Sequence, residues 1–322
     1  MRSILWYLGL LVATGGALAQ SFPAKPIKII VPTSPGGLND LISRTLGQSI
    51  SESVGQPVVV ENRPGAGSMI GMLALAKSPA DGYTIAITTA EPLVYNPLLY
   101  TKMPYDAEKD FSYISQLVRT LGAIIAPASA PFGTFPEMIA LAKAKPGSLN
   151  WATWGPGSTP AMYLEWIKRQ NGVDIVAVPY KGAGPSLPAT VSGEVQLTYT
   201  GIGLALPLIR TGKLKALAIT GADVAPPIPD VAPLGKFNSD PGLASGFAAY
   251  GPANIPGAIM ERLSAELRIA LRAPGAVKAM ENNMVPVGNT PAEFAAQIKG
   301  DRVNAARVLK AMGIKATDAP DK

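Results

Sequence analysis

Two glycine-rich turns carry the clearest chemistry in this sequence. The first, Pro35-Gly36-Gly37, lies between an apolar, β-branched run at residues 29–31 and a helical pattern that begins at Leu38. Glycines at the start of a helix give the turn its φ freedom and leave backbone N–H groups open, with the positive end of the helix dipole behind them. Such a turn attracts a carboxylate or a phosphate, although a strand–helix turn that binds nothing would contain the same residues.

The second turn covers residues 154–160, Trp-Gly-Pro-Gly-Ser-Thr-Pro, and precedes a helical pattern at residues 161–170. Either Ser158 or Thr159 suits the N-cap of that helix. Two such turns in two halves of the chain predict a ligand held between them. Each turn offers backbone amides and no fixed cation, which favours one carboxylate per turn. The ligand would then be a small dicarboxylate, or a carboxylate with a second polar end.

Hydroxyl groups at predicted strand ends are candidates for the rest of the ligand. Thr88 and Thr89 end the predicted strand at residues 83–88, and Thr200 ends another. In an open parallel sheet the ligand lies beyond the carboxyl ends of the strands. Together with Ser158, these side chains would hydrogen-bond the ligand. A capped turn without a ligand is the alternative for Thr88 and Thr89.

Aromatic and charged residues near the turns leave the class of ligand open. Trp154 and Tyr180 either line the middle of the cleft, which would admit an aromatic acid, or pack in a core. Glu91 could instead meet an amine, which would indicate an amino acid. We expect Asp40 to interact with the N-terminus of its own helix and to brace the turn. Lys181 is expected at the rim of the cleft.

The glycine loop at residues 65–71 is a weak match to a dinucleotide-binding fingerprint. Its third glycine is one position late, and no acidic residue closes the next strand to hold a ribose. Tight packing of a helix on a sheet, with a contribution to the rim of the cleft, explains this loop better than nucleotide binding does.

Composition excludes several kinds of chemistry. The 322 residues include no cysteine and no histidine, which rules out disulfides, thiol catalysis, Ser-His-Asp catalysis and cysteine- or histidine-ligated metal. The net charge of +6 is scattered, without a basic run, so we expect no nucleic-acid partner. We expect no catalytic residue, metal or cofactor. An exported enzyme acting on an anionic substrate is the alternative, with Lys181 or Asp40 as its base.

The N-terminus reads as a secretory signal. Residues 1–19 contain Arg2, an apolar run at 4–12 and the small-x-small site Ala17-Leu18-Ala19. No later stretch is long and apolar enough to span a membrane without Pro or charge. The mature protein is therefore expected to be exported, soluble and monomeric.

The order of predicted elements indicates an α/β protein with two domains. Residues 27–88 read as βαβαβ, and the second half repeats this order. We predict that each domain is a mostly parallel sheet flanked by helices, with a ligand cleft between the domains and two crossover strands. The predicted division is a signal at 1–19, domain I at 20–121 plus 245–322, and domain II at 122–244. The C-terminal helices, including 291–312 with Phe294, Ile298, Val303 and Leu309 inside, should pack on domain I.

Motifs spread along nearly the whole mature chain resemble those of the substrate-binding proteins of tripartite tricarboxylate transporters, also called the Bordetella uptake gene or TctC-like family. The matching motifs are Val31-Pro32 with Pro35-Gly36-Gly37 and Asp40, Glu61-Asn62-Arg63-Pro64-Gly65-Ala66-Gly67, Ala80-Asp81-Gly82-Tyr83-Thr84, Asn96-Pro97 with Leu99-Tyr100, Val178-Pro179-Tyr180-Lys181-Gly182, and Gly212-Lys213-Leu214-Lys215-Ala216.

The resemblance implies a type II-like periplasmic binding protein that closes on a carboxylate and delivers it to a membrane permease. In the family, backbone amides and waters hold the carboxylate at turns that correspond to residues 35–37 and 155–158. A histidine often follows the second turn, but Ala161 stands there in this sequence, and Trp154 and Glu91 occupy variable positions. The residues expected to contact the ligand are Thr33, Ser34, Pro35, Gly36, Gly37, Leu38, Asp40, Thr88, Thr89, Trp154, Gly155, Gly157, Ser158, Thr159, Tyr180, Lys181, Gly182 and Thr200.

Overall fold

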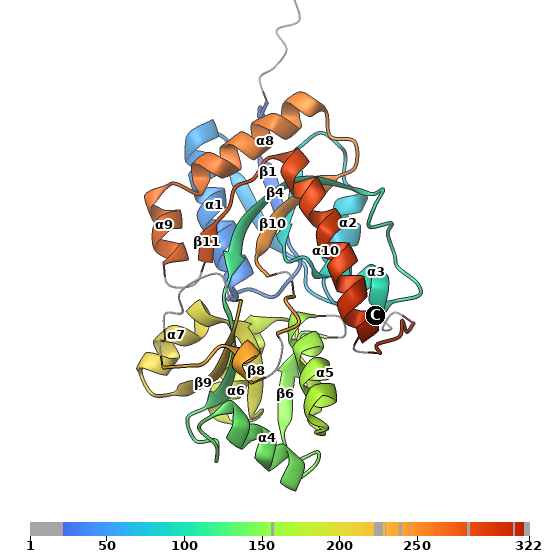
Figure 1. Ribbon diagram of the computed structural model, residues 1–322. Helices are drawn as coiled ribbons and strands as arrows, with labels where there is room; N and C mark the ends of the chain where they lie inside the picture. Colours follow the sequence, from blue (N-terminus) through green and yellow to red (C-terminus); the bar gives the residue numbers. More distant parts are fainter. Residues whose placement is uncertain are drawn as a thin grey trace, which may run out of the picture.

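The protein forms two lobes, each a β-sheet covered by helices (Figure 1). The computed structural model describes residues 22–155, 158–221, 228, 230–237, 240–243, 245–281, 284–311 and 313–318. The predicted signal at residues 1–19 lies outside these ranges. We call the six-stranded sheet with its helices the first lobe, and the five-stranded sheet with its helices the second lobe.

The first lobe is built from both ends of the described chain. Its strands are β1 (Ile27–Val31), β2 (Val58–Asn62), β3 (Thr84–Thr88), β4 (Phe111–Thr120), β10 (Phe247–Pro252) and β11 (Met284–Pro286). Its helices are α1 (Leu38–Val54), α2 (Met69–Ala76), the π-helical turn η1 (Glu91–Tyr95), α3 (Asn96–Leu99), α8 (Gly257–Ala270), α9 (Pro274–Met280) and α10 (Pro291–Ala311). As predicted, the C-terminal helices pack on this lobe, since α8 and α9 contact α1, and α10 contacts β4.

The second lobe is built from the middle of the chain. Its strands are β5 (Gly122–Pro127), β6 (Asn150–Thr153), β7 (Val176–Pro179), β8 (Leu197–Gly201) and β9 (Leu214–Thr220). Its helices are α4 (Phe135–Ala144), α5 (Thr159–Asn171), α6 (Ala183–Ser192), α7 (Ile202–Arg210) and the short 3-10 turn η2 (Leu234–Lys236). Pro136 lies in the first turn of α4, where its missing N–H costs nothing. Thr134 caps this helix by accepting from the amide of Glu137.

Both sheets are mixed rather than mostly parallel, which corrects that part of the prediction. The strand orders are β11-β4-β10-β3-β1-β2 and β7-β6-β8-β5-β9. Within each, the βαβ strands pair in parallel, β1 with β2 and β3, and β6 with β7 and β8. The other pairings are antiparallel, because a strand that enters from the opposite lobe is inserted between neighbours in each sheet. The α/β class and the two-lobed arrangement are confirmed.

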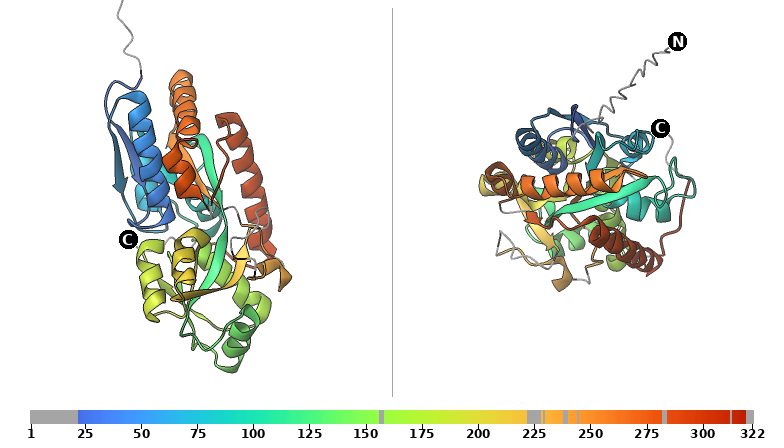
Figure 2. Two further views of the ribbon diagram at one scale, coloured as in Figure 1. Left: turned by 90° about the vertical axis from the view of Figure 1, so that its left-hand side faces the viewer. Right: turned by 90° about the horizontal axis from the view of Figure 1, so that it is seen from above.

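The chain changes sheet at Leu121, between β4 and β5, which follow one another as a long extended segment through both lobes (Figure 2). It returns to the first sheet between β9 and β10. The division into residues 20–121 plus 245–322 and 122–244 stays a prediction, and residue 244 itself lies outside the described residues.

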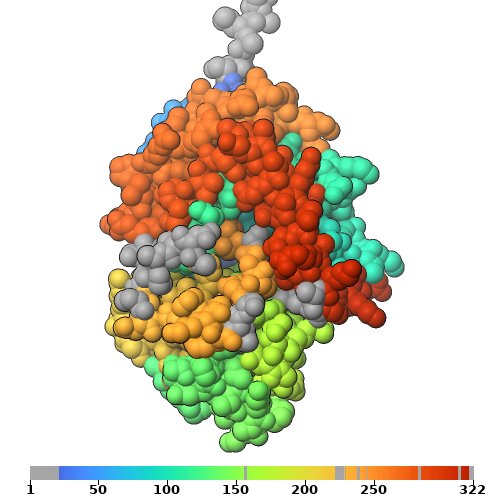
Figure 3. All heavy atoms as spheres, viewed as in Figure 1, coloured from blue at the N-terminus to red at the C-terminus, as the bar shows by residue number. Residues whose placement is uncertain are grey.

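Helical phase decides which apolar residues of α1 and α10 are buried. Along α1, Leu38, Ile42 and Leu46 are buried, whereas Leu41 is 43% exposed. Along α10, Phe294 and Ile298 are buried, but Val303 is 73% exposed. The prediction that Val303 lies inside is wrong, because nine residues after Phe294 a helix has turned to its opposite face. In Figure 3, α10, in red, extends from the first lobe down to the boundary between the lobes.

Among the helices of the described residues, none is both long and apolar enough to cross a membrane.

Candidate functional site

A small cavity of about 60 Å³ lies between the two lobes. The N-terminus of α1 and the segment after β3 contribute to it from the first lobe, and the start of α5 and the end of β8 contribute from the second. The residues that line it are Thr33, Gly37, Leu38, Asn39, Thr89, Glu91, Thr120, Trp154, Thr159, Ala183, Tyr199, Thr200, Gly201, Leu204, Ser245, Gly246 and Phe247. None of these described residues is Lys or Arg, so the polar side-chain groups of the cavity are hydroxyls, the amide of Asn39, the indole N–H of Trp154 and the carboxylate of Glu91.

The N-terminus of α1 faces this cavity without a cap. Gly37 is the N-cap residue, and no side chain accepts a hydrogen bond from the first turn there. Gly36 has a left-handed backbone, with φ at 88°, whereas Gly37 is extended, with φ at −85°. Of the two glycines, Gly36 alone therefore needs a positive φ. The expectation that Gly37 also supplies this backbone freedom is wrong. The open amides of the first turn lie at the positive end of a 17-residue helix.

Asp40 braces the turn before α1 through a hydrogen bond to its backbone, as predicted. Its Oδ2 accepts from the amide of Gly36 at 3.1 Å, and its Oδ1 accepts from the Asn62 side chain at 3.0 Å and pairs with Arg44 at 2.9 Å. Burial raises the pKa of Asp40, but the bonds from Arg44, Gly36 and Asn62 outweigh it and lower the pKa below its usual value. Asp40 does not line the cavity, so its role is to hold the turn in shape.

Several buried polar atoms on the cavity wall have no hydrogen-bond partner. Both amide atoms of Asn39 are unpaired although the residue is only 4% exposed, and the hydroxyl of Thr200 is unpaired at 1% exposure. The hydroxyl of Thr33 and the indole N–H of Trp154 are also buried and unpaired. Leaving such groups without a partner costs free energy, so they indicate a place where a ligand or water supplies the missing bonds. Asn39 was not predicted from the sequence.

The start of α5, the second predicted anion site, is already in contact with a carboxylate of the protein itself. Glu91, from η1 of the first lobe, accepts at Oε1 from the backbone amide and the hydroxyl of Thr159, each at 2.5 Å. Its Oε2 accepts from the hydroxyl of Thr89 at 2.5 Å. Ser158 is the N-cap residue, but its hydroxyl donates to the carbonyl of Gly155 and does not cap the helix. Glu91 thus joins the lobes.

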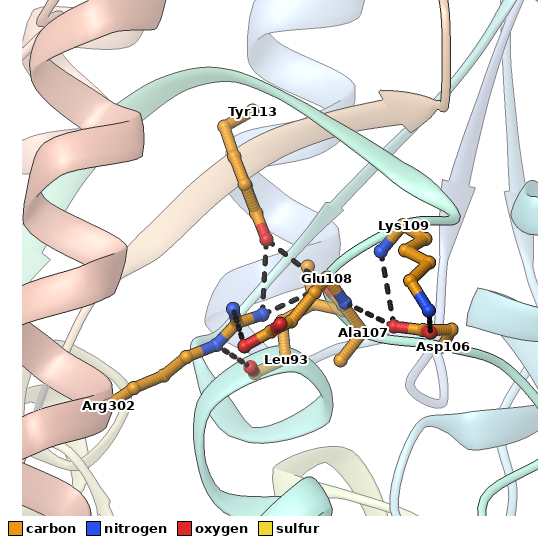
Figure 4. Close-up of polar contacts among 7 residues, drawn as sticks. All are labelled: Leu93, Asp106, Ala107, Glu108, Lys109, Tyr113 and Arg302. Carbon is orange, nitrogen blue, oxygen red and sulfur yellow. Dashed lines mark hydrogen bonds and ion pairs between the residues drawn. The ribbon is translucent and has the colours of Figure 1, made fainter.

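Arg302 of α10 holds η1, the segment that carries Glu91, in place (Figure 4). The guanidinium donates to the carbonyl of Leu93 at 2.9 Å, to the carbonyl of Ala107 at 2.8 Å and to the hydroxyl of Tyr113 at 3.1 Å. It also pairs with Glu108 at 3.3 Å. These bonds join α10 to segments far away in the sequence and hold η1 against the first lobe.

An outer groove of about 470 Å³ adjoins the cavity. It shares Thr33, Glu91 and Trp154 with the cavity, so these residues stand between the two spaces. Lys181 lies on this groove and is exposed, as expected for a residue of the rim. Tyr180 also lines it; a hydrogen bond to Glu194 raises the pKa of Tyr180 to about 12.

The predicted site residues fall into three groups. Those on the cavity wall are Thr33, Gly37, Leu38, Thr89, Trp154, Thr159 and Thr200. Those on the outer groove alone are Gly155, Ser158, Tyr180, Lys181 and Gly182. Those that line neither are Ser34, Pro35, Gly36, Asp40 and Thr88. Gly157 lies outside the described residues. Contact of any of these with a ligand stays a prediction.

Several residues that line the cavity were not predicted from the sequence. Besides Asn39, these are Thr120 at the end of β4, Tyr199 on β8 and Ser245 before β10. Among the described residues, no group of three or more Asp and Glu side chains is placed to hold a metal ion.

Two α/β lobes with a small cavity between them are typical of proteins that bind a ligand by closing around it. The chain belongs to the tripartite tricarboxylate transporter family receptors, whose sequence profile matches residues 42–314. It is 32% identical to Protein BugT of Bordetella pertussis, over 98% of this chain and 99% of that protein.

Solved structures agree with this assignment. One described as a periplasmic transporter is 33% identical, with a TM-score of 0.87 over 92% of this chain and 99% of its own. Rpa4515 of R. palustris, solved with adipate, is 30% identical, with a TM-score of 0.85 over 92% of this chain and all of its own. MatC of Rhodopseudomonas palustris, solved with bound malate, is 26% identical, with a TM-score of 0.83 over 89% and 100%.

Proposed function

We propose that this protein is an extracytoplasmic solute-binding protein that captures a small carboxylate between its lobes. The observation that carries the proposal is the uncapped N-terminus of α1, which faces a cavity lined by the unpaired, buried amide of Asn39. Open backbone amides at a helix start bind a carboxylate without a fixed cation. The relatives solved with adipate and malate support the same class of ligand.

The proposal extends to location and partners. The leader at residues 1–19 would direct export to the periplasm, where the signal is removed. The closed protein would then dock on the membrane subunits of a tripartite tricarboxylate transporter and release its ligand there. No catalytic step is proposed, because capture and release need none. Product analysis after incubation of purified protein with candidate acids distinguishes this function from that of an exported enzyme.

A thermal-shift screen tests the ligand class. The panel contains aliphatic monocarboxylates and dicarboxylates, tricarboxylates, aromatic acids and amino acids, with neutral sugars as controls. A ligand at a hundred times its dissociation constant stabilises the folded state by roughly 2.7 kcal/mol, which is a visible shift in melting temperature. Stabilisation by sugars alone would contradict the proposal.

A further inference from the structure

Among the helix N-termini at the cavity, the two that the glycine turns predicted as carboxylate sites differ, since α1 is open and α5 is occupied. At α1 no side chain caps the first turn, whereas at α5 the amide of Thr159 donates to the carboxylate of Glu91. Glu91 is 5% exposed and accepts two further bonds, from the hydroxyls of Thr159 and Thr89. The position at α5 that would suit a second ligand carboxylate is therefore filled by the protein.

The charge of the cavity also disfavours a second ligand carboxylate. Among the described residues on its wall, Glu91 is the one charged side chain. The unpaired groups there, on Asn39, Thr200 and Trp154, are neutral donors and acceptors. A second ligand carboxylate in the cavity would meet the negative charge of Glu91 with no Lys or Arg among the described residues of the wall, in a space where burial strengthens the repulsion. Lys181 lies on the adjoining outer groove instead. Neutral amide or hydroxyl groups would find partners instead.

We infer that the ligand carries a single carboxylate, held at the N-terminus of α1, and an uncharged or cationic remainder, and that Glu91 excludes dicarboxylates. This inference rests on the proposed function and narrows it. It also replaces the expectation of one ligand carboxylate per glycine turn, because the second turn is served by Glu91. The cavity of about 60 Å³ holds roughly four to six water-sized groups at ~10–15 Å³ each, which suits a short acid.

Matched pairs of a dicarboxylate and its monoamide test the inference. Succinate with succinamate, and glutarate with glutaramate, have the same number of non-hydrogen atoms and differ by one carboxylate. Dissociation constants are measured by calorimetry for each member at neutral pH and fixed salt. We expect the monoamide of at least one pair to bind the wild-type protein at least tenfold more tightly than its dicarboxylate.

Two substitutions assign the preference to Glu91. Glu91→Gln keeps the size of the side chain and removes its charge, and Glu91→Ala vacates the start of α5. Both should reduce the preference for the monoamide by at least tenfold, and Glu91→Ala should bind the dicarboxylate more tightly than the wild type does. Glu52→Ala, which removes an exposed carboxylate from the far half of α1, is the control and should keep the wild-type ratio. Circular dichroism checks that each variant is folded.

The possible results distinguish failure of the single-carboxylate inference from failure of the proposed carboxylate-binding function. A wild-type protein that binds a dicarboxylate more tightly than its monoamide overturns the single-carboxylate inference and leaves the carboxylate-binding function standing. An unchanged ratio in folded Glu91→Gln overturns the role of Glu91. If no acid of the full screening panel binds, the proposed function fails, and the inference fails with it.

Discussion

Ser34 and Lys181 join the two lobes through their backbones. The amide of Ser34, in the turn before α1, donates to the carbonyl of Lys181, in the loop before α6, at 3.1 Å. Next to this bond, Gly184 lies so close to Pro35 that a Cβ atom there would come within 2.3 Å of the Pro35 carbonyl oxygen. The closed arrangement of the lobes therefore needs a glycine at position 184.

Gly184→Ala should prevent full closure and weaken ligand binding by at least tenfold, equivalent to about 1.4 kcal/mol. Small-angle scattering with saturating ligand should show a larger radius of gyration for the variant than for the wild type. Gly300→Ala, in α10 with no atom within 4 Å of the added Cβ, is the matched control and should retain wild-type affinity. Equal affinity in both variants would show that this contact is not part of the ligand-bound state.

Asn39→Asp should greatly weaken carboxylate binding by placing a negative charge at the open start of α1. We expect a loss of roughly a hundredfold or more, because the introduced carboxylate would repel the ligand carboxylate and compete with it for the same amides. Asn39→Ala, which removes neutral hydrogen bonds alone, should weaken binding by roughly tenfold. Calorimetric titration of both folded variants gives the comparison. Similar losses in the two would place the ligand carboxylate away from α1.

Asp40→Asn should destabilise the protein in a pH-dependent way. The lowered pKa of Asp40 means that its ionised form stabilises the fold above its ordinary pKa of 3.8, and that this stabilisation is lost as the pH falls through the lowered value. At pH 7 the loss should be roughly 1–3 kcal/mol, from weakened bonds to Gly36, Asn62 and Arg44. Urea unfolding at several pH values should show the difference from wild type shrinking below about pH 4. A constant difference would refute this account of the turn.

Arg302→Met should destabilise the first lobe, since the carbonyls of Leu93 and Ala107 would lose a donor while the apolar stem is kept. Two such losses amount to roughly 2–4 kcal/mol in the free energy of unfolding. Arg307→Met, on the exposed side of the same helix, should change it by no more than about 0.5 kcal/mol. Equal effects of the two substitutions in urea unfolding would mean that the contacts of Arg302 contribute little.

Local pattern was enough to predict much of this structure. The βαβ order at residues 27–88 and the turn before Leu38 depend on residues close in sequence. The antiparallel pairings were missed, because insertion of β10 beside β3 depends on where the returning chain enters the sheet. The strand β4 (Phe111–Thr120) was not predicted, because its polar residues give no sign of the burial that the two-lobed fold creates.

At the candidate site, too, features that depend on contacts distant in the sequence were not predicted. The turn at α1 was found because its glycines and its helix are contiguous. Asn39 was missed because an amide in the first turn of a helix carries no signal of burial until the second lobe closes over it. The bond between Glu91 and Thr159 joins residues 68 positions apart, and nothing in the local sequence of either residue indicates it. Of the two expected ligands, a small dicarboxylate and a carboxylate with a second polar end, that bond favours the second.

The most direct test of the central claim compares an acid with its uncharged amide. The acid that stabilises the protein most in the thermal screen, and the primary amide made from its carboxyl group, are titrated into wild-type protein by calorimetry at neutral pH. Capture of a carboxylate by the open amides of α1 predicts that the acid binds at least tenfold more tightly than the amide. An amide that binds as tightly as the acid would contradict it.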